Sequence, residues 1–323
     1  MKVSEKNRKI WFAALMAAAG VNVVLWSLTW RLDYDVSPGV FGRGILSGFA
    51  VASCIVCVII SLLPAFFSGR GNAEAGDFLT DTSRRGSEAA ALTSCFIIAA
   101  SVLTVLKSSD GGNTVVALLA LVLSVPAAVY FASVCILKNQ DAAIIRVCAP
   151  FPPLWGIFVT LYHYLSTARA INDPIKVVCQ FIPIGIMLYI TAEMKMRLSE
   201  CTKSYFFTTR AVLVTIGSVS LSLVIDATVT AVSNLISQLG ADVAPGMLVF
   251  AVRPHELTLA IAGVGAALYA LGRRRGTTDE TPAEPEEPLP EETVSEGEND
   301  VTEITDEIDN NNEINEKDNG ETT

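Results

Sequence analysis

The feature that most constrains this chain is a series of apolar runs, each about 18 to 25 residues long. At 1.5 Å per residue, a helix of that length crosses the roughly 30 Å of hydrocarbon in a bilayer. Backbone groups find no hydrogen-bond partners in hydrocarbon, and a helix satisfies them within one segment. The sequence therefore predicts an all-α, polytopic integral membrane bundle.

Eight such runs predict a transmembrane domain over residues 1–275. We expect helices at approximately 10–30, 45–67, 90–106, 114–137, 147–166, 177–193, 211–236 and 253–272. The first run follows basic residues, as the core of a signal peptide does. Its apolar stretch extends from Ile10 to Trp30, however, which is too long for a typical signal peptide. We therefore predict that it stays as a membrane helix.

The distribution of Lys and Arg predicts the orientation of the helices. If the N-terminus lies inside, the cytoplasmic segments of the eight-helix arrangement hold sixteen Lys and Arg and the outer segments hold six. Short cytoplasmic loops of membrane proteins carry this excess of positive charge. We expect a multi-pass protein of the cell membrane with both termini in the cytoplasm.

The acidic character of the chain belongs to its C-terminal end. From Thr277 onward there are eighteen Asp and Glu and one Lys, a charge of −17, which leaves +7 on the preceding residues and −10 on the whole chain. This segment has almost no apolar residues with which to form a core, so residues 276–323 are predicted to be a disordered, low-complexity cytoplasmic tail. It is either a solvated extension or an attachment for a basic partner.

The residues that usually carry enzyme or metal chemistry are sparse. Cys54 and Cys57 have the spacing of a redox or metal motif, but they lie within an apolar run, where small packed thiols are the simpler interpretation. Only two histidines are present, and no Walker, HExxH or GxSxG motif occurs. We expect no catalytic residue, no metal, no cofactor and no nucleic-acid partner.

The most informative polar pattern lies in the seventh run. Polar side chains recur on one face of this predicted helix: Thr215, Ser218, Ser222, Asp226, Thr230, Ser233 and Asn234. A carboxylate at the depth of Asp226 costs several kcal/mol unless it is paired, hydrated or protonated. One interpretation is a hydrated cavity with a cation or proton site formed by Asp226, Ser222, Thr230 and Asn234. The other is that the hydroxyls hold helices together and Asp226 has a structural partner.

Further polar residues are predicted to lie in the outer half of the membrane. His163 lies between two tyrosines of the fifth run, and Arg253, His255 and Glu256 open the last run, where Pro254 suits a first helical turn. Together with Asp226 they would form one polar site. Alternatively, His163 belongs to an interfacial aromatic belt and the other three residues are a solvated helix start.

Two other patterns predict structure rather than function. Glu193 and Arg197 are spaced to form an i,i+4 pair at a cytoplasmic helix end. Small residues four positions apart, Gly48 with Ala52 and Gly263 with Ala267, indicate close helix packing.

One part of the chain resembles a known group of proteins. The segments Pro152-Pro-Leu-Trp-Gly156, Asn172-Asp-Pro174 and Ala192-Glu-Met-Lys-Met-Arg197 are similar to a helix pair in uncharacterised multi-span membrane proteins of Firmicutes. The resemblance covers about a quarter of the chain. It implies a membrane-spanning fold and no specific activity.

These patterns favour a non-enzymatic membrane component, such as an accessory or sensory subunit. Its partners would be the lipid bilayer and a protein that binds the inner loops or the acidic tail. The alternative is a transporter for a small solute or cation that uses the polar face around Asp226. An intramembrane enzyme is disfavoured, because no Ser/His, paired-Asp or metal-ligand arrangement is evident.

Overall fold

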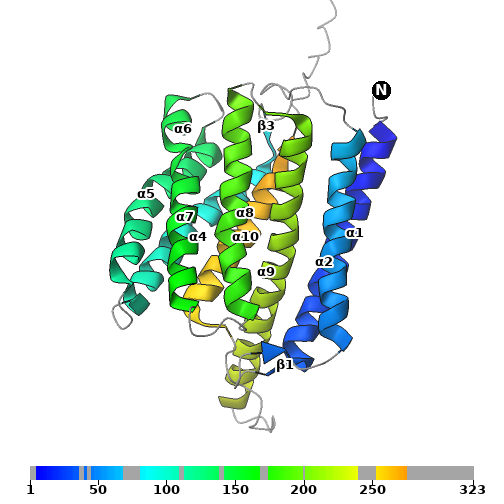
Figure 1. The fold of residues 1–323 in the computed structure, drawn as a ribbon, viewed down its shortest axis with the longest axis vertical. Coiled ribbons are helices and arrows are strands. Elements are labelled where there is room, and N and C mark those ends of the chain that lie inside the picture. The colour runs from blue at the N-terminus through cyan, green and yellow to red at the C-terminus, as the bar shows by residue number, and fades with distance from the viewer. Residues whose placement is uncertain are drawn as a thin grey trace, which may run out of the picture. The chain divides into compact units, whose positions relative to one another are not determined.

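The apolar runs are helices in the computed structural model of this protein (Figure 1). The structure describes residues 5–35, 40–41, 45–67, 81–108, 113–137, 142–167, 174–198, 201–238 and 252–274. Its helices are α1 Glu5–Leu32, α2 Ile45–Phe67, α4 Arg84–Ser108, α5 Thr114–Ile136, α6 Ala143–Cys148, α7 Phe151–Thr167, α8 Pro174–Arg197, α9 Lys203–Gln238 and α10 Pro254–Gly272. The predicted all-α polytopic bundle is confirmed. The predicted tail, residues 276–323, lies outside the described residues.

Four strands of two residues each accompany the helices. β1 (Tyr34–Asp35) pairs antiparallel with β2 (Val40–Phe41), between α1 and α2. β3 (Asp81–Thr82) pairs antiparallel with β4 (Arg273–Arg274). The second pair places the start of α4 beside the end of α10.

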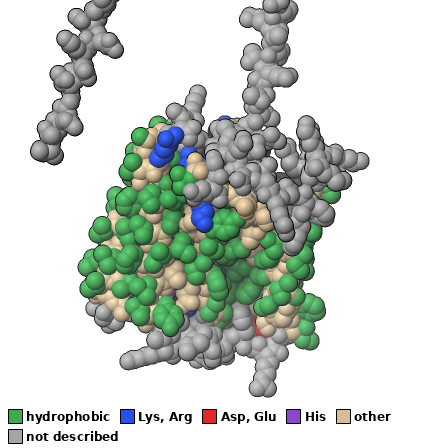
Figure 2. All heavy atoms as spheres, turned by 45° about the horizontal axis from the view of Figure 1, so that its top comes forward, with side chains coloured by type: hydrophobic (Ala, Val, Ile, Leu, Met, Phe, Trp, Pro, Cys, Tyr) green, Lys and Arg blue, Asp and Glu red, His purple; other side chains and the backbone are tan. Residues whose placement is uncertain are grey.

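The length and surface of the helices suit a membrane. Among the described residues, seven helical segments are long and apolar enough to span one. The remaining predicted span corresponds to α2, a helix of 23 residues. Its segment Ile45–Ile60 is a shorter apolar helix. Large apolar side chains such as Phe49 and Val122 are exposed, and Figure 2 shows apolar side chains spread over the face in view. A soluble protein rarely exposes so much apolar surface, so the chain is membrane-embedded.

The helices extend beyond several predicted spans, and two spans differ most. The fifth, 147–166, is divided into α6 and α7, and α7 starts at Phe151 because Pro150 cannot donate a backbone hydrogen bond. The seventh, 211–236, is part of a longer helix, since α9 has 36 residues. At 1.5 Å per residue α9 is about 54 Å long, well beyond the hydrocarbon thickness.

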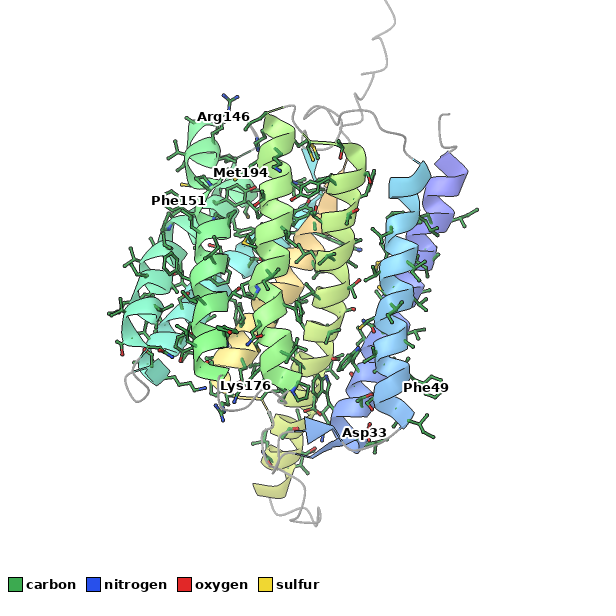
Figure 3. All side chains as sticks on the ribbon, in the orientation of Figure 1. Asp33, Phe49, Arg146, Phe151, Lys176 and Met194 are labelled. Atoms are coloured by element: carbon green, nitrogen blue, oxygen red, sulfur yellow. The ribbon has the colours of Figure 1, made fainter. Side chains whose placement is uncertain are left out.

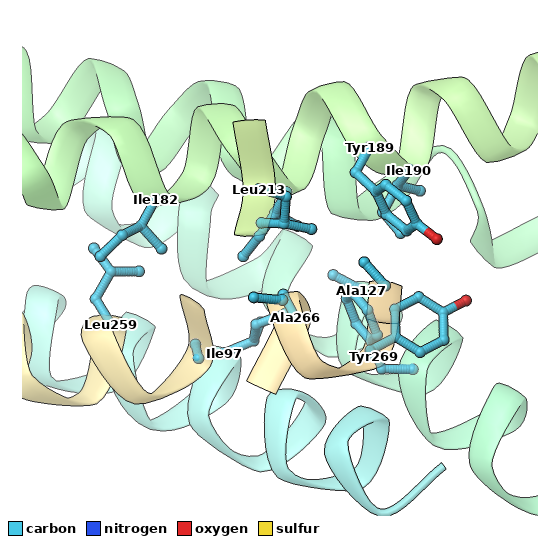
Figure 4. Packing of buried hydrophobic residues seen from close by; sticks show 14 of the residues in the cluster. Ile97, Ala127, Ile182, Tyr189, Ile190, Leu213, Leu259, Ala266 and Tyr269 are labelled. Carbon is cyan, nitrogen blue, oxygen red and sulfur yellow. The ribbon is translucent and has the colours of Figure 1, made fainter. Parts of the chain in front are cut away.

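The helices run between two ends of the bundle. We call the end at which α1 begins the N-terminal end and the opposite end the distal end (Figure 1). Arg146 and Met194 lie toward the N-terminal end, and Lys176 and Asp33 lie toward the distal end (Figure 3). Most of the apolar core is one cluster shared by the helices, part of which Figure 4 shows with Ile97, Ile182 and Tyr269.

Helix α10 is at the centre of the arrangement. It packs against α4, α9 and α8, while α5 and α7 complete the body through α4 and α8. The α1–α2 hairpin packs on α9. The polar groups described below lie at these helix contacts.

Small residues allow α10 to approach its neighbours closely. A methyl group on Gly265 would lie 2.5 Å from the Thr93 hydroxyl oxygen and 3.2 Å from the Ala89 carbonyl oxygen of α4. On Gly263 it would lie 2.9 Å from Ile182, which confirms the close packing predicted there. The packing predicted at Gly48 is wrong, because nothing lies within 4 Å of the corresponding position and Ala52 is exposed.

Gly265→Ala should destabilise the bundle, because the added methyl group clashes with backbone and a buried hydroxyl that cannot withdraw. The expected loss is about 1 to 3 kcal/mol, measured by unfolding of the full chain in detergent. Gly20→Ala is the matched control, since nothing lies within 4 Å of that position. It should leave stability unchanged or raise it by helix propensity. Equal effects of the two substitutions would contradict close packing of α4 on α10.

Candidate functional site

The polar face of α9 is covered by α1. We call this interface the polar seam. It comprises Asn22, Trp30 and Arg31 of α1 and Ser218, Ser222, Asp226 and Thr230 of α9. The Asn22 amide donates to the Ser218 hydroxyl at 2.5 Å, and the Trp30 indole N–H donates to the Ser222 hydroxyl at 3.0 Å. Hydrogen bonds thus connect two helices that are about 190 residues apart in sequence.

Asp226 has its partner in the same seam. Nε of Arg31 lies 2.5 Å from a carboxylate oxygen of Asp226. The same guanidinium donates to the Asp226 backbone carbonyl at 3.0 Å and to the Thr230 hydroxyl at 2.9 Å. The Asp226 side chain is 8% exposed and that of Arg31 is 34% exposed. This pairing offsets the cost of a carboxylate at that depth, which supports the structural interpretation of Asp226.

Two serine hydroxyls of the seam both donate and accept hydrogen bonds. Ser222 donates to the Val219 carbonyl at 2.7 Å while it accepts from Trp30. Ser218 likewise donates to the Thr215 carbonyl at 2.7 Å while it accepts from Asn22. A hydroxyl has one proton to donate, so these side chains are satisfied by protein. Asn234, one turn beyond Thr230, is half-buried.

Helix α2 joins the seam through Asn22. The Ser53 hydroxyl donates to the Asn22 side-chain oxygen at 2.5 Å, and the Cys54 thiol lies 3.3 Å from the same oxygen. The Trp26 indole N–H lies 3.1 Å from the Cys54 sulfur. Both Cys54 and Cys57 are free thiols, and Cys57 is fully buried. The interpretation of these cysteines as packed thiols agrees with these contacts.

A second polar group lies at the distal end. We call it the histidine group. It comprises Lys107 of α4, His163 of α7, and His255 and Glu256 of α10. The two imidazole rings stack with centroids 6.2 Å apart and an interplanar angle of 10°. Nζ of Lys107 lies 3.1 Å from Nε2 of His255, which lies 3.8 Å from a Glu256 carboxylate oxygen. Both histidines and Glu256 are buried.

The first turn of α10 confirms part of what its sequence predicts. The helix begins at Pro254, and the backbone N–H of Arg253 donates to Glu256 at 2.9 Å in a capping box. The Arg253 side chain is exposed, as at a solvated helix start. Glu256 and His255 are buried, so the same turn is not solvated on its inner side.

The residues expected to form one outer site therefore lie in two groups. Asp226, Ser222 and Thr230 belong to the seam between α1 and α9. His163, His255 and Glu256 belong to the histidine group on α7 and α10. Sequence reasoning counted Arg31 only as a loop charge and missed it as the partner of Asp226. One sequence signal for this pair was available. Arg31 directly follows the first apolar run, and its expected depth in the membrane is close to that of Asp226.

A third polar group lies at the N-terminal end. We call it the Glu193 network. Tyr130 donates to the Glu193 carboxylate at 2.6 Å, Tyr269 donates to it at 3.0 Å, and Nε of Arg273 lies 3.2 Å from it. The side chains of Glu193 and Arg273 have no exposed surface. Arg273 also donates to the Thr82 hydroxyl at 2.8 Å, beside the strand pair that joins α4 to α10.

Glu193 does more than pair with Arg197 at a helix end, as the spacing of the two residues predicts. Its carboxylate is enclosed by α5, α8 and α10, although Arg197 lies near enough to interact with it electrostatically. Sequence reasoning missed Tyr130, Tyr269 and Arg273, because their common partner is visible only in three dimensions. A tyrosine in the middle of an apolar run was the one available signal, since a buried tyrosine hydroxyl usually has a partner.

These groups hold helices together. In the described part of the chain, no cluster of three or more His, Cys, Asp or Glu could hold a metal ion. No family model, curated protein or solved structure matches the chain. The resemblance of residues 152–197 to membrane proteins of Firmicutes therefore stays a prediction.

Tyr130→Phe should destabilise the protein, because it removes a short hydrogen bond from a buried carboxylate. A hydrogen bond to a charged group contributes about 1.5 to 3 kcal/mol. Tyr189→Phe is the matched control, since this tyrosine is equally buried and its hydroxyl has no hydrogen-bond partner among the described residues. It should leave stability unchanged in the same unfolding measurement. A similar loss for both variants would show that ring packing rather than the Glu193 network is responsible.

A double-mutant cycle on Arg31→Gln and Asp226→Asn should reveal coupling across the seam. Because Arg31 is one-third exposed, solvent weakens the pair, and we expect a coupling energy of about 1 kcal/mol. The cycle on Arg84→Gln and Glu88→Gln is the control, since that exposed pair lies within one helix. It should show little coupling. Additive effects of the Arg31 and Asp226 substitutions would contradict a role for this pair in holding α1 on α9.

Proposed function

We propose that this protein is a non-enzymatic component of the cell membrane, an accessory or sensory subunit. The observation that supports this best is the coverage of the polar face of α9 by α1. Ser218, Ser222 and Asp226 are bound by Asn22, Trp30 and Arg31. A helix that lines a transport path needs polar groups that meet water, whereas these meet protein.

The charge distribution supports an orientation with both termini in the cytoplasm. On this assignment the N-terminal end of the bundle faces the cytoplasm, where sixteen of the twenty-two Lys and Arg before the tail are located. The tail, with its charge of −17 from Thr277 onward, is then on the same side. The inner loops and the tail are the proposed contacts for a protein partner.

The sensory variant of this proposal rests on α10. This helix carries His255 and Glu256 in its first turn, at the distal end of the bundle. It carries Tyr269 near its last turn, beside Arg273, at the N-terminal end of the bundle. It is packed closely on α4 through Gly265 and Gly272, so a displacement at one end is transmitted along a rigid element. A change in the histidine group would reach the Glu193 network.

The second candidate function is a carrier for a small solute or cation. The observation that favours it is the position of the seam, which separates the α1–α2 hairpin from the helices packed around α10. If the hairpin moved away from α9, the same hydroxyls and Asp226 would be exposed in a polar path. Asp226 would then serve as the cation or proton site.

Ion flux in proteoliposomes separates these functions. With the full chain reconstituted, we expect no current above empty liposomes when gradients of H⁺, Na⁺ or K⁺ are imposed. A cation carrier would give a current that Asp226→Asn abolishes while the protein remains folded. Such a current would overturn the proposal.

A positive test uses the tail. The full chain is crosslinked mildly in native membranes and purified, and we expect it to carry a defined protein partner. The partner should be lost when residues 276–323 are replaced by a neutral Gly/Ser segment of equal length. The Arg84→Gln variant is the control and should retain the partner, because it changes an exposed charge of the bundle and leaves the tail intact. Persistence of the complex without the acidic tail would contradict this role for the tail.

A further inference from the structure

The pair of Arg31 and Asp226 is the one ionic contact among the residues of the polar seam. Besides the contacts of Arg31, hydrogen bonds between neutral side chains join α1 to α9 there: Asn22 with Ser218 and Trp30 with Ser222. These side chains neither gain nor lose a proton near neutral pH. The ion pair, in contrast, exists only while Asp226 is ionised. The seam therefore has one contact that a change in pH can remove.

Arg31 holds α9 through a single guanidinium. Its Nε lies 2.5 Å from the Asp226 carboxylate, and its Nη2 donates to the Asp226 backbone carbonyl at 3.0 Å and to the Thr230 hydroxyl at 2.9 Å. A guanidinium keeps its charge at every pH at which proteins are folded, so the ion pair can be neutralised only at Asp226. The two remaining acceptors are neutral, and they hold a cation less strongly than a carboxylate does.

The two partners differ in their access to water. The Asp226 side chain is 8% exposed, whereas the Arg31 side chain is 34% exposed and lies in the last turn of α1. A neutral carboxylic acid costs far less in an apolar environment than a carboxylate does. A long cationic side chain at a helix end can extend to the membrane surface instead. Uptake of a proton therefore favours a buried Asp226 and a solvated Arg31, which no longer form an ion pair.

Arg31 is the charged group that acts on Asp226 among the described residues. Asp33 follows at the distal end (Figure 3), but its carboxylate accepts from the Ser47 backbone N–H of α2 at 3.2 Å. Helix α2 has no charged residue. Its thiols lie elsewhere, since Cys54 contacts Asn22 and Cys57 belongs to an apolar cluster with Leu15. The hairpin thus brings no second titratable group to Asp226.

Two other helices that pack on α9, α8 and α10, carry charge at the distal end. Their charged and titratable residues there are Lys176, Arg253, His255 and Glu256. Within the described chain these residues act on Lys107 or on the histidines rather than on Asp226. The ion pair of the seam is therefore separate from the histidine group in its response to pH.

Loss of the ion pair would loosen one end of the hairpin. The hydrogen bonds of Asn22 and Trp30 do not need it, so the N-terminal part of α1 stays in place. The last turn of α1 and the β1–β2 pair that follows would then have fewer contacts with α9. The movement is limited to the distal end of the hairpin, where it exposes Asp226 and Thr230.

We propose that protonation of Asp226 from the distal side releases Arg31 and separates the distal end of the α1–α2 hairpin from α9. On the orientation predicted from Lys and Arg, the distal side is the outer side of the membrane. The contact is closed at neutral pH, when Asp226 is ionised, and opens as the pH on that side falls. This inference does not depend on the proposed function, because the ion pair is present whether the protein is an accessory subunit or a carrier.

Distance measurements by electron spin resonance on the full chain in lipid nanodiscs test this proposal. Genetically encoded spin labels, which leave the native cysteines in place, are introduced at the exposed positions Leu32 of α1 and Val232 of α9. We expect the distance distribution to become longer and broader from about pH 7.5 to about pH 4, where aspartates take up protons. A second label pair, at the exposed positions Met16 and Ser204 toward the N-terminal end, should show no change.

Three variants assign the change to one carboxylate. Asp226→Asn imitates the neutral acid, so it should give the longer distance already at about pH 7.5 and no further response to acid. Arg31→Gln should behave in the same way, which keeps the test valid if Asp226→Asn does not fold. His255→Gln is the control and should keep the response, because His255 belongs to the histidine group.

Four outcomes would overturn the proposal. The first is a distance between Leu32 and Val232 that does not respond to pH, and the second is a response that survives in Arg31→Gln. The third is an equal change at the second label pair, which would indicate acid unfolding of the whole interface. The fourth is loss of the response in His255→Gln, which would assign the sensitivity to the histidine group instead.

Discussion

Hydrocarbon provides no hydrogen bonds, and a polar side chain inside the bundle is therefore costly unless it finds a partner in protein. That constraint explains why the polar residues of this chain lie at contacts between helices that are distant in sequence. Arg31 and Asp226 join α1 to α9, Lys107 and His255 join α4 to α10, and Glu193 joins α8 to α5 and α10. Each group fixes the rotation of its helices, which apolar packing alone would leave less well defined.

Helix α10 connects two of these groups. Its glycines allow it to pack closely on α4 and α8, and it carries buried polar residues at both ends. A rigid central helix between a histidine group on one side of the membrane and the Glu193 network on the other is suited to passing on a change of state. This is the structural basis on which we propose a sensory or accessory role. It does not depend on water or a solute entering the bundle.

The two halves of the α1–α9 interface differ in chemistry. In the distal half, Ser218, Ser222, Asp226 and Thr230 of α9 have partners on α1. In the N-terminal half, Arg210 lines an apolar hollow and has only a backbone carbonyl as a partner. The two halves of the interface therefore differ in how completely their polar groups are paired.

The sequence alone determined the all-α membrane architecture, because the length of an apolar run and the cost of unpaired backbone groups are local properties. It also identified Asp226, Ser222, Thr230 and the two histidines as unusual, since a polar residue in an apolar run is visible without any structure. Only the tertiary structure decided their partners. Arg31, Tyr130 and Arg273 come from other helices, and which faces meet depends on packing between helices far apart in the chain. For the same reason it divided one expected polar site into two and gave Glu193, near the end of its helix, a buried network of partners.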